Sequence, residues 1–390
     1  MNTFLQFDSL AMVSILAYMA LWLIAVVAAP KRDLDRGGFT SALTILGGTV
    51  LAYASASIWG FIAGWVITQI PTLRKNSNLR PIPKFTLFTS AIALTVGAVL
   101  TGTGNDSLAW LAYSSFVVAA LLRKGMFPAH FWVVSAFETG SLFELGLLMN
   151  SHLGAYLMVR FAVPLLPANA LEALPLAGVL TLFTSVYAAV RALAEGKPRR
   201  VLALLCVSQA SFILAGLENR NVEGITGALV QLWVVAFATT GLLGVYSALE
   251  VRSGEVESPR GFLGYGSVTP RLAVFFAACG LALVGLPGTL GFASEDLLFH
   301  GALETHPFLG IALPLATALN AITVLRLFAT LFLGRRAAQC PQVPDARPRE
   351  RWALAAPVVF LVAGGIFPGV FFALRSPAAE RLVELLSGAL

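Results

Sequence analysis

Charged residues are scarce in this sequence. Only 12% of its 390 residues are Asp, Glu, Lys or Arg, 57% are hydrophobic, and the mean hydropathy is +0.81. A soluble protein of this length needs far more polar surface, so the composition predicts a polytopic membrane protein embedded in the lipid bilayer. The net charge of +6 lies mostly in short loops, which indicates membrane topology rather than a nucleic-acid partner.

Cysteine is also scarce, and the three thiols at Cys206, Cys279 and Cys340 form no CxxC pair or Cys/His cluster. This spacing argues against a disulfide framework and against an Fe–S or zinc centre. The sequence lacks a recognisable nucleotide-binding loop, catalytic triad or metal motif. We therefore expect no cofactor, no bound metal and no autonomous catalytic site, and at most a translocase subunit of a larger oxidoreductase or transport complex.

Long hydrophobic runs are abundant. A run of about 20 apolar residues crosses a bilayer as a helix, and the first run also lacks the basic start of a cleavable signal peptide. The run at 40–70 is longer than a bilayer needs, so we expect one tilted or bent helix there. The predicted all-α fold has about eleven transmembrane helices, at about residues 8–29, 40–70, 85–103, 107–124, 141–163, 172–194, 200–217, 223–249, 268–285, 308–333 and 352–373.

Glycine and proline interrupt two of these runs. The interrupting residues are Gly125 and Pro128 after the fourth span, and Gly285, Pro287, Gly288 and Gly291 after the ninth. A broken helix is tolerated in a membrane only where protein or a water-filled cavity satisfies the freed backbone groups. Interruptions at matching positions in two halves predict inverted repeats around an ion or substrate pathway.

The repeats divide the chain into three parts. We expect a first five-helix unit at 1–165, a second, inverted unit at 166–334, and a basic loop, last transmembrane helix and tail at 335–390. Lys and Arg are more frequent in the loops after even-numbered spans. The positive-inside rule then places the N-terminus in the cytoplasm and the C-terminus outside, with the arginines of 347–351 facing the cytoplasm.

Titratable residues at membrane depth indicate an ion path, because a charge buried there is expensive without a partner or water. Lys124 is the strongest candidate, since a buried lysine could alternate between charged and neutral forms. The alternative is that Lys124 and Arg123 extend to the cytoplasmic surface. His130 and Glu138 are eight residues apart and could pass a proton. Equally, Glu138 could cap a helix or pair with an arginine.

A second group of candidates lies in the fifth span and after the second break. Glu144, His152 and Arg160 recur at eight-residue spacing, which favours a polar stripe on one helix face. Alternatively, only His152 is deep and plays a structural part. Glu295 follows the second break, where a carboxylate could also interact with a helix N-terminus. The predicted proton path comprises Lys124, His130, Glu138, Glu144, His152 and Glu295.

Four segments together resemble a known family. Lys124-Gly125, with the following Phe127 to Trp132, resembles the signature of the antiporter-like proton-translocating subunits of respiratory complex I, Mrp-type antiporters and membrane-bound hydrogenases. Similar segments follow in family order at 154–160, 199–209 and 285–295. The resemblance implies two inverted five-helix bundles and a midplane proton path in a prokaryotic inner membrane. It also implies other membrane and cytoplasmic subunits as partners, and it places the start of this chain at the family's fourth helix.

The sequence departs from that family at charged positions. Where relatives place a glutamate opposite the lysine, this chain has Gly60, and Gln231 and Trp233 lie in a stretch that lacks the family's central relay lysine. We therefore expect Lys124 to contact Glu138 or Glu144 instead. The polar path should be confined to the first half, with nearly dry surroundings for Trp233.

Three functions fit this pattern. The first is a proton-conducting subunit of an energy-converting complex. The second is a membrane scaffold subunit that has lost conduction. The third is the membrane partner in a DAB-type inorganic-carbon uptake complex, in which the resemblance implies docking of a soluble carbonic-anhydrase-like protein. The basic residues of 335–351 could bind an acidic partner surface under any of the three.

Overall fold

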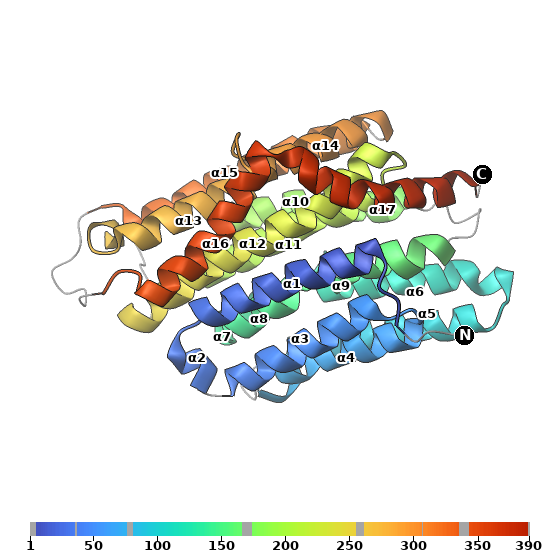
Figure 1. The fold of residues 1–390 in the computed structure, drawn as a ribbon, viewed down its shortest axis with the longest axis horizontal. Coiled ribbons are helices and arrows are strands. Elements are labelled where there is room, and N and C mark those ends of the chain that lie inside the picture. The colour runs from blue at the N-terminus through green and yellow to red at the C-terminus, as the bar shows by residue number, and fades with distance from the viewer. Residues whose placement is uncertain are drawn as a thin grey trace.

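The computed structural model describes residues 5–35, 37–75, 81–165, 174–254, 261–305, 307–334 and 343–388, and the regular elements in these ranges are all helices. Long helices run side by side along one axis (Figure 1). Helices α1 to α9 lie on one side of the molecule and α12 to α17 on the other, and α1 and α12 contact each other at the boundary.

The helices of the N-terminal side are α1 (Ser9–Ala28), α2 (Lys31–Asp35), α3 (Gly38–Ala54), α4 (Ile58–Lys75), α5 (Pro81–Gly102), α6 (Asp106–Lys124), α7 (Phe131–Thr139), α8 (Leu142–Asn150), α9 (Leu153–Leu157), the π-helical turn η1 (Met158–Ala162) and the 3-10 turn η2 (Val163–Leu165). The remaining helices are α10 (Leu174–Ala194), α11 (Pro198–Leu217), α12 (Val222–Ser253), the 3-10 turn η4 (Tyr265–Ser267), α13 (Pro270–Leu283), α14 (Leu290–Thr305), α15 (Pro307–Phe332), α16 (Pro348–Ile366) and α17 (Pro368–Gly388).

Helix starts are specified locally. The side chains of Asp8, Asn105 and Asn221 accept hydrogen bonds from the first turns of α1, α6 and α12, which satisfies backbone donors that have no partner inside a helix. Helices α11, α13 and α16 each begin with a proline in the first turn, where its missing N–H costs nothing.

Seven helices in the described ranges are long and apolar enough to cross a bilayer, and α16 with α17 adds an eighth if this pair, bent by 85°, is one span. Helices α3 and α13 are apolar but shorter. The expected set of about eleven spans and the inverted repeats remain predictions.

The expectation of one tilted or bent helix over residues 40–70 is wrong. Helices α3 and α4 form a hairpin instead, with a turn at 55–57 where the Ser57 hydroxyl accepts the Gly60 N–H at 3.2 Å. The two backbones meet at glycines: a methyl group on Gly64 would lie 2.5 Å from the Gly48 carbonyl oxygen. If both helices cross the bilayer, every later loop lies on the other side, relative to the N-terminus, from the one predicted.

The basic loops gather at one end of the bundle, which we call the basic end. Arg32 and Arg199 line one cavity of about 560 Å³ with Glu138. Arg349 donates a hydrogen bond to the Ala29 carbonyl at 2.8 Å, and Arg252 donates to the carbonyl of Pro344 at 2.9 Å. Arg335 and Arg336 lie outside the described residues.

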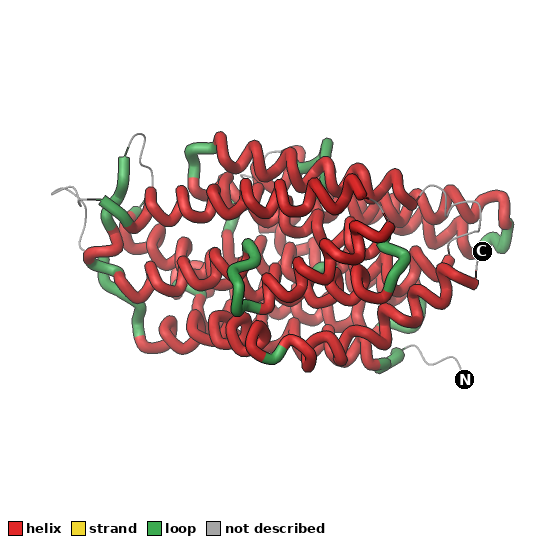
Figure 2. Tube along the Cα trace, turned by 90° about the horizontal axis from the view of Figure 1, so that it is seen from above, coloured by secondary structure: helices red, strands yellow, loops and turns green. Residues whose placement is uncertain are grey.

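The opposite end carries the start of α1 and the end of α17, which both views place on the same side of the molecule (Figures 1 and 2). Asp8, Arg160 and Arg381 line a cavity of about 420 Å³ there. The side chains of Asp8 and Arg160 form an ion pair across that cavity.

Candidate functional site

The first interruption lies between α6 and α7. Gly125 ends α6 in the left-handed conformation, with φ +70°, and a methyl group there would lie 2.4 Å from a Val133 methyl carbon. The Phe127 N–H donates to the Thr184 hydroxyl at 3.1 Å, and the Trp132 indole donates to the Leu122 carbonyl at 2.7 Å. Protein groups thus satisfy the backbone that the break releases, as a membrane requires.

The second interruption lies between α13 and α14. Gly285 and Gly288 both have positive φ, at +71° and +88°, a conformation that favours glycine. Close packing adds a second requirement, because a methyl group on Gly291 would lie only 1.9 Å from the Ala282 carbonyl oxygen. Pro287 lies between the two left-handed glycines, exposed at the surface of the bundle.

Lys124 is the last residue of α6, and its side chain is buried. The ammonium nitrogen lies 2.7 Å from the Met149 carbonyl oxygen and 2.8 Å from His152 Nδ1. The alternative in which Lys124 and Arg123 reach the surface is therefore wrong: Arg123 is also buried, 4.4 Å from the centre of the Trp65 ring.

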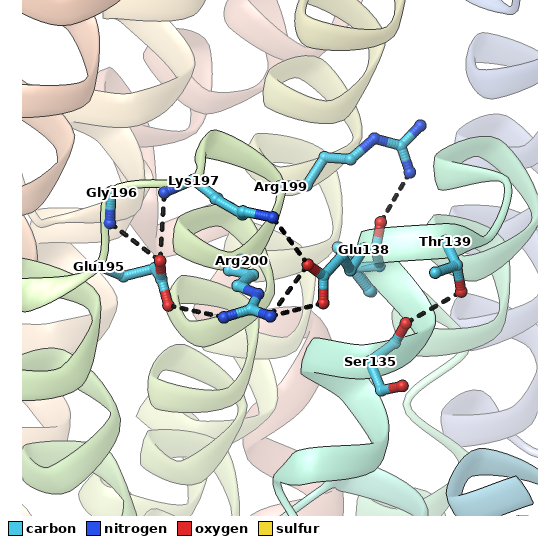
Figure 3. A network of polar contacts seen from close by, with 9 residues as sticks. Ser135, Glu138, Thr139, Glu195, Gly196, Lys197, Arg199 and Arg200 are labelled. Carbon is cyan, nitrogen blue, oxygen red and sulfur yellow. Dashed lines mark hydrogen bonds and ion pairs between the residues drawn. The ribbon is translucent and has the colours of Figure 1, made fainter. Parts of the chain in front are cut away.

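The expected direct contact of Lys124 with a carboxylate is also wrong, since its hydrogen bonds within the described residues go to Met149 and His152; a contact through water stays a prediction. Glu138 lies instead at the basic end, where it pairs with Arg200 at 2.8 Å and Lys197 at 3.2 Å (Figure 3). The Arg200 guanidinium holds the pKa of Glu138 below its usual range, and Lys197 contributes. Glu138 thus pairs with an arginine, the simpler of its two interpretations.

Arg199 completes this network by fixing the end of α7 to the start of α11. Its guanidinium donates to the carbonyls of Phe137 and Gly140 at 2.7 and 2.8 Å, and it binds both carboxylate oxygens of Glu250 at 2.5 and 2.6 Å. A bidentate arginine–carboxylate pair has a defined geometry as well as a charge interaction. At the basic end, ion pairs and hydrogen bonds therefore hold α7, α11 and α12 together.

The predicted stripe of Glu144, His152 and Arg160 does not form on one helix face. The helix is interrupted between α8 and α9, where His152 has φ +45°, and Arg160 lies in the π-helical turn beyond. Glu144 is buried in α8, towards the basic end, whereas Arg160 pairs with Asp8 at the opposite end. Only His152 meets Lys124.

Three tyrosines hold the interruption beside His152. The hydroxyls of Tyr18 and Tyr53, from α1 and α3, donate to the carbonyls of Leu147 and Ser151, and Tyr156 donates to the Tyr53 carbonyl at 2.8 Å. A buried carbonyl without a partner is costly, so these bonds stabilise the bend. We call Tyr18, Tyr53 and Tyr156 the tyrosine clamp.

His130 lies apart from this pair. It is buried beside the first break, stacked on Phe127, with Nε2 3.4 Å from the Tyr187 hydroxyl. In the second half, Glu295 lines a cavity of about 230 Å³ beside Gly285 and accepts a hydrogen bond from Thr317 at 3.3 Å. The predicted path residues are thus distributed over several sites, and the structure brings together only two of them.

The second half has a neutral polar cluster at its core. Gln231 donates to Gln209 at 3.2 Å and accepts a hydrogen bond from Ser294 at 2.5 Å. Trp233 is also in polar surroundings, because the buried Arg375 guanidinium lies 4.2 Å from the centre of its ring. The expectation of nearly dry surroundings for Trp233 is therefore wrong.

Within the described ranges, no group of three or more His, Cys, Asp or Glu side chains is placed to hold a metal ion. A family model described as NADH:quinone oxidoreductase/Mrp antiporter, TM, matches residues 20–320. The chain belongs to this family.

Similar members of the NADH:quinone oxidoreductase/Mrp antiporter family include "NAD(P)H-quinone oxidoreductase chain 4 2" of Synechococcus sp. (strain JA-3-3Ab). It is 25% identical over 418 residues, covering 97% of this chain and 78% of that protein. "NADH-quinone oxidoreductase subunit N 3" of Streptomyces griseus subsp. griseus is 25% identical over 374 residues, covering 92% of this chain and 63% of that protein.

This antiporter-family chain has the same fold as single chains in two solved structures of large assemblies. A chain of the Mrp complex from Dietzia sp. DQ12-45-1b has a TM-score of 0.88 at 16% identity, covering 97% of this chain and 84% of that chain. A chain of respiratory complex I from Thermus thermophilus with bound NADH has a TM-score of 0.85 at 22% identity, covering 98% and 86%. At these identities the likeness shows the fold alone.

Sequence reasoning missed one central residue of this family member, Arg375. The predicted last span ends at about residue 373, which leaves Arg375 outside it, but Arg375 belongs to α17, which the 85° bend directs back towards α1 and α12. Its guanidinium donates to the Ser14 hydroxyl at 3.2 Å. The sequence does contain a signal for it, because Arg375 directly follows the apolar residues Phe371 to Leu374. A charged residue in an apolar segment of a membrane protein is usually functional.

Proposed function

We propose that this protein is a proton-conducting membrane subunit of an energy-converting complex, and that protons pass through Lys124 and His152. The observation that carries the proposal is the buried 2.8 Å contact between these side chains beside a broken helix. A lysine and an imidazole at this distance can exchange a proton, and neither is paired with a carboxylate among the described residues.

An access route to this pair leads from the opposite end of the bundle. The cavity that holds Asp8 and Arg160 shares Leu10 and Val159 with a smaller central cavity lined by His152. Protons would enter beside the Asp8–Arg160 ion pair and reach His152 past these two apolar residues. On the other side of the pair, the buried Glu144 lies between His152 and the basic end, so it is the next candidate.

We assign the basic end to the cytoplasm of a prokaryotic cell, because the positive-inside rule then holds for the loops beside Arg32, Arg199, Arg252 and Arg349. This reverses the predicted orientation and places the N-terminus outside. With α3 and α4 as separate spans, the inverted repeats would be α3 to α9 and α10 to α15, each with five spans. Their broken helices, α6 with α7 and α13 with α14, resemble each other in their glycine turns.

The partners would be further membrane and cytoplasmic subunits of such a complex. The relatives are named as oxidoreductase chains, and the similar folds come from multi-subunit assemblies. The basic end, where the Lys197 side chain is 53% exposed, could bind an acidic surface of another subunit through its lysine and arginine side chains.

A scaffold without conduction is the second candidate. It is favoured by the Gln209–Gln231–Ser294 cluster, because neutral side chains cannot store a proton as a lysine can. Under this reading the buried lysine would only position the broken helix.

Proton uptake by proteoliposomes under an imposed membrane potential separates the two. The conduction proposal expects Lys124→Met to reduce uptake at least about tenfold, while Gln231→Leu stays near the wild-type rate. Thermal unfolding of both variants controls for loss of fold. Wild-type uptake by a folded Lys124→Met variant would eliminate the relay and leave the scaffold function.

A further inference from the structure

Three buried cations lie in the interior of the N-terminal side and its boundary with α12: Arg123, Lys124 and Arg375. Their described partners are all neutral. Arg123 contacts Trp65 and Thr68, Lys124 contacts the Met149 carbonyl and His152, and Arg375 contacts Trp233 and Ser14. Charges buried without an opposite charge are strongly unfavourable in a membrane protein. This arrangement favours a counter-ion that the described part of the chain does not supply.

A cavity of about 30 Å³ lies between Arg375 and His152, where α1, α9, α12 and α17 meet. A cavity on this scale has room for about two water molecules. A chloride ion is only slightly larger than one water molecule and fits, whereas phosphate or an organic acid does not. Tyr18, Tyr53 and Trp233 complete the wall.

Arg375 and His152 both line the cavity, and each has a buried nitrogen without a hydrogen-bond partner among the described residues: Arg375 Nε and His152 Nε2. The other polar groups of the wall are engaged. The Tyr18 hydroxyl donates to Leu147, and the Asn150 amide donates to Ala236 and Thr240. An arginine Nε–H can only donate, so one residue of the cavity wall has at least one free donor beside its positive charge.

The second donor depends on the state of Lys124. A charged lysine donates to His152 Nδ1, so the imidazole proton must reside on Nε2, where it faces the cavity as a second donor. A neutral lysine can accept a hydrogen bond from Nδ1–H, which leaves a lone pair on Nε2. An anion is attracted by the first arrangement and repelled by the second.

We propose that this cavity is a binding site for a small monovalent anion, chloride being the natural probe, and that each anion binds together with one proton on Lys124. The anion is then a mobile counter-ion in place of a fixed carboxylate. By linkage, chloride favours the protonated lysine as much as protonation favours chloride. The groups that face Lys124 are Arg123 on its own helix, His152, and Cys206 on α11. Those that face the cavity are Arg375 and the tyrosine clamp.

The test uses the full chain in lipid nanodiscs, titrated with sodium chloride against sodium gluconate at constant ionic strength. Chloride should raise the unfolding temperature saturably, and a pH indicator in weakly buffered solution should record uptake of up to one proton per chloride. At pH values where Lys124 is mostly neutral, the apparent Kd should rise about tenfold per pH unit, the slope for one linked proton.

Variants locate the site. Arg375→Gln should raise the apparent Kd at least about tenfold, since it removes a charge-assisted donor. His152→Phe should do the same if Arg375→Gln fails to fold, and Lys124→Met should abolish proton uptake. Arg123→Gln is the matched control, because Arg123 also lies over a tryptophan but contacts Trp65 and Thr68 and does not line the cavity. It should retain chloride binding and proton uptake, with the uptake moved to higher pH because one positive charge near Lys124 is removed.

Two results would overturn the proposal. One is the absence of any chloride-specific stabilisation, which would mean that the cavity holds only water. The other is an unchanged response in folded Arg375→Gln or His152→Phe protein. Neither result depends on proton conduction. If the Lys124→Met variant binds chloride and still conducts protons at the normal rate, the proposed proton relay is wrong and the anion site stands.

Discussion

Replacement of Gly291 by alanine tests the packing of the second broken helix. A methyl group at this position would lie 1.9 Å from the Ala282 carbonyl oxygen and 3.4 Å from a Val234 methyl carbon. The first distance is far inside van der Waals contact and involves backbone, which cannot rotate away. Overpacking typically costs about 1–3 kcal/mol, and the upper end of that range is expected because α13 and α14 must separate.

Gly47→Ala is the matched control. Gly47 also lies in a helix, but no heavy atom lies within 4 Å of an added methyl group. Alanine there should stabilise by about 0.5–1 kcal/mol, since glycine is the weaker helix former. The two variants should therefore differ by about 3–4 kcal/mol in opposite directions from wild type.

Thiol reactivity during thermal unfolding measures this difference. Cys206 and Cys279 are buried, so a thiol-reactive dye labels them only when the bundle opens. The measurement uses a Cys340→Ser background, which leaves these two thiols as the reporters. Equal unfolding temperatures for Gly291→Ala and Gly47→Ala would refute the argument that α14 starts with glycine because of the Ala282 carbonyl.

Three further outcomes are expected. Arg200 lowers the pKa of Glu138, so their ion pair should stabilise the protein fully above pH 4.5, the ordinary carboxyl pKa, and lose this effect as the pH falls through the lowered pKa of Glu138. Glu138→Gln should remove this pH dependence of the unfolding temperature. At pH 7 it should change the stability by less than about 1 kcal/mol, because the pair is partly exposed. Asn150→Leu should lower the unfolding temperature, by about 1–3 kcal/mol of stability, because it leaves the Thr239 and Thr240 hydroxyls and the Ala236 carbonyl short of a partner; an unchanged temperature would contradict this. With the basic end in the cytoplasm, an impermeant thiol reagent added outside intact cells should label Arg381→Cys and spare Lys197→Cys, and the reverse pattern would restore the predicted orientation.

The broken helices could be predicted because their signals are local. Gly125 and Gly285 take positive φ, a conformation that favours glycine, and each lies within three residues of a proline in an apolar run. Lys124 could also be identified, since a lysine in an apolar run stands out. The contact between Lys124 and His152 could not be predicted, because the positive φ of His152 and the bend beside it depend on hydrogen bonds from α1 and α3.

The α3–α4 hairpin and the burial of Arg375 were missed for a different reason. The turn at 55–57 contains no glycine or proline, and it is fixed by close packing of Gly48 on Gly64. Arg375 is brought to Trp233 by the bend between α16 and α17. Both depend on which helices meet in space, and hydropathy along the chain does not contain that information.

The tyrosine clamp ties the lysine site to helices at the edge of the bundle. Tyr18 belongs to α1, whose outward face carries Met12, Leu16 and Met19 in exposed positions. A neighbouring subunit that pressed on this face would shift the Leu147 carbonyl through a single hydrogen bond, and with it the turn that orients His152. Such a shift would change the distance between Lys124 and His152 without any change at the lysine itself, so that binding of a neighbour at α1 would be felt at the buried pair.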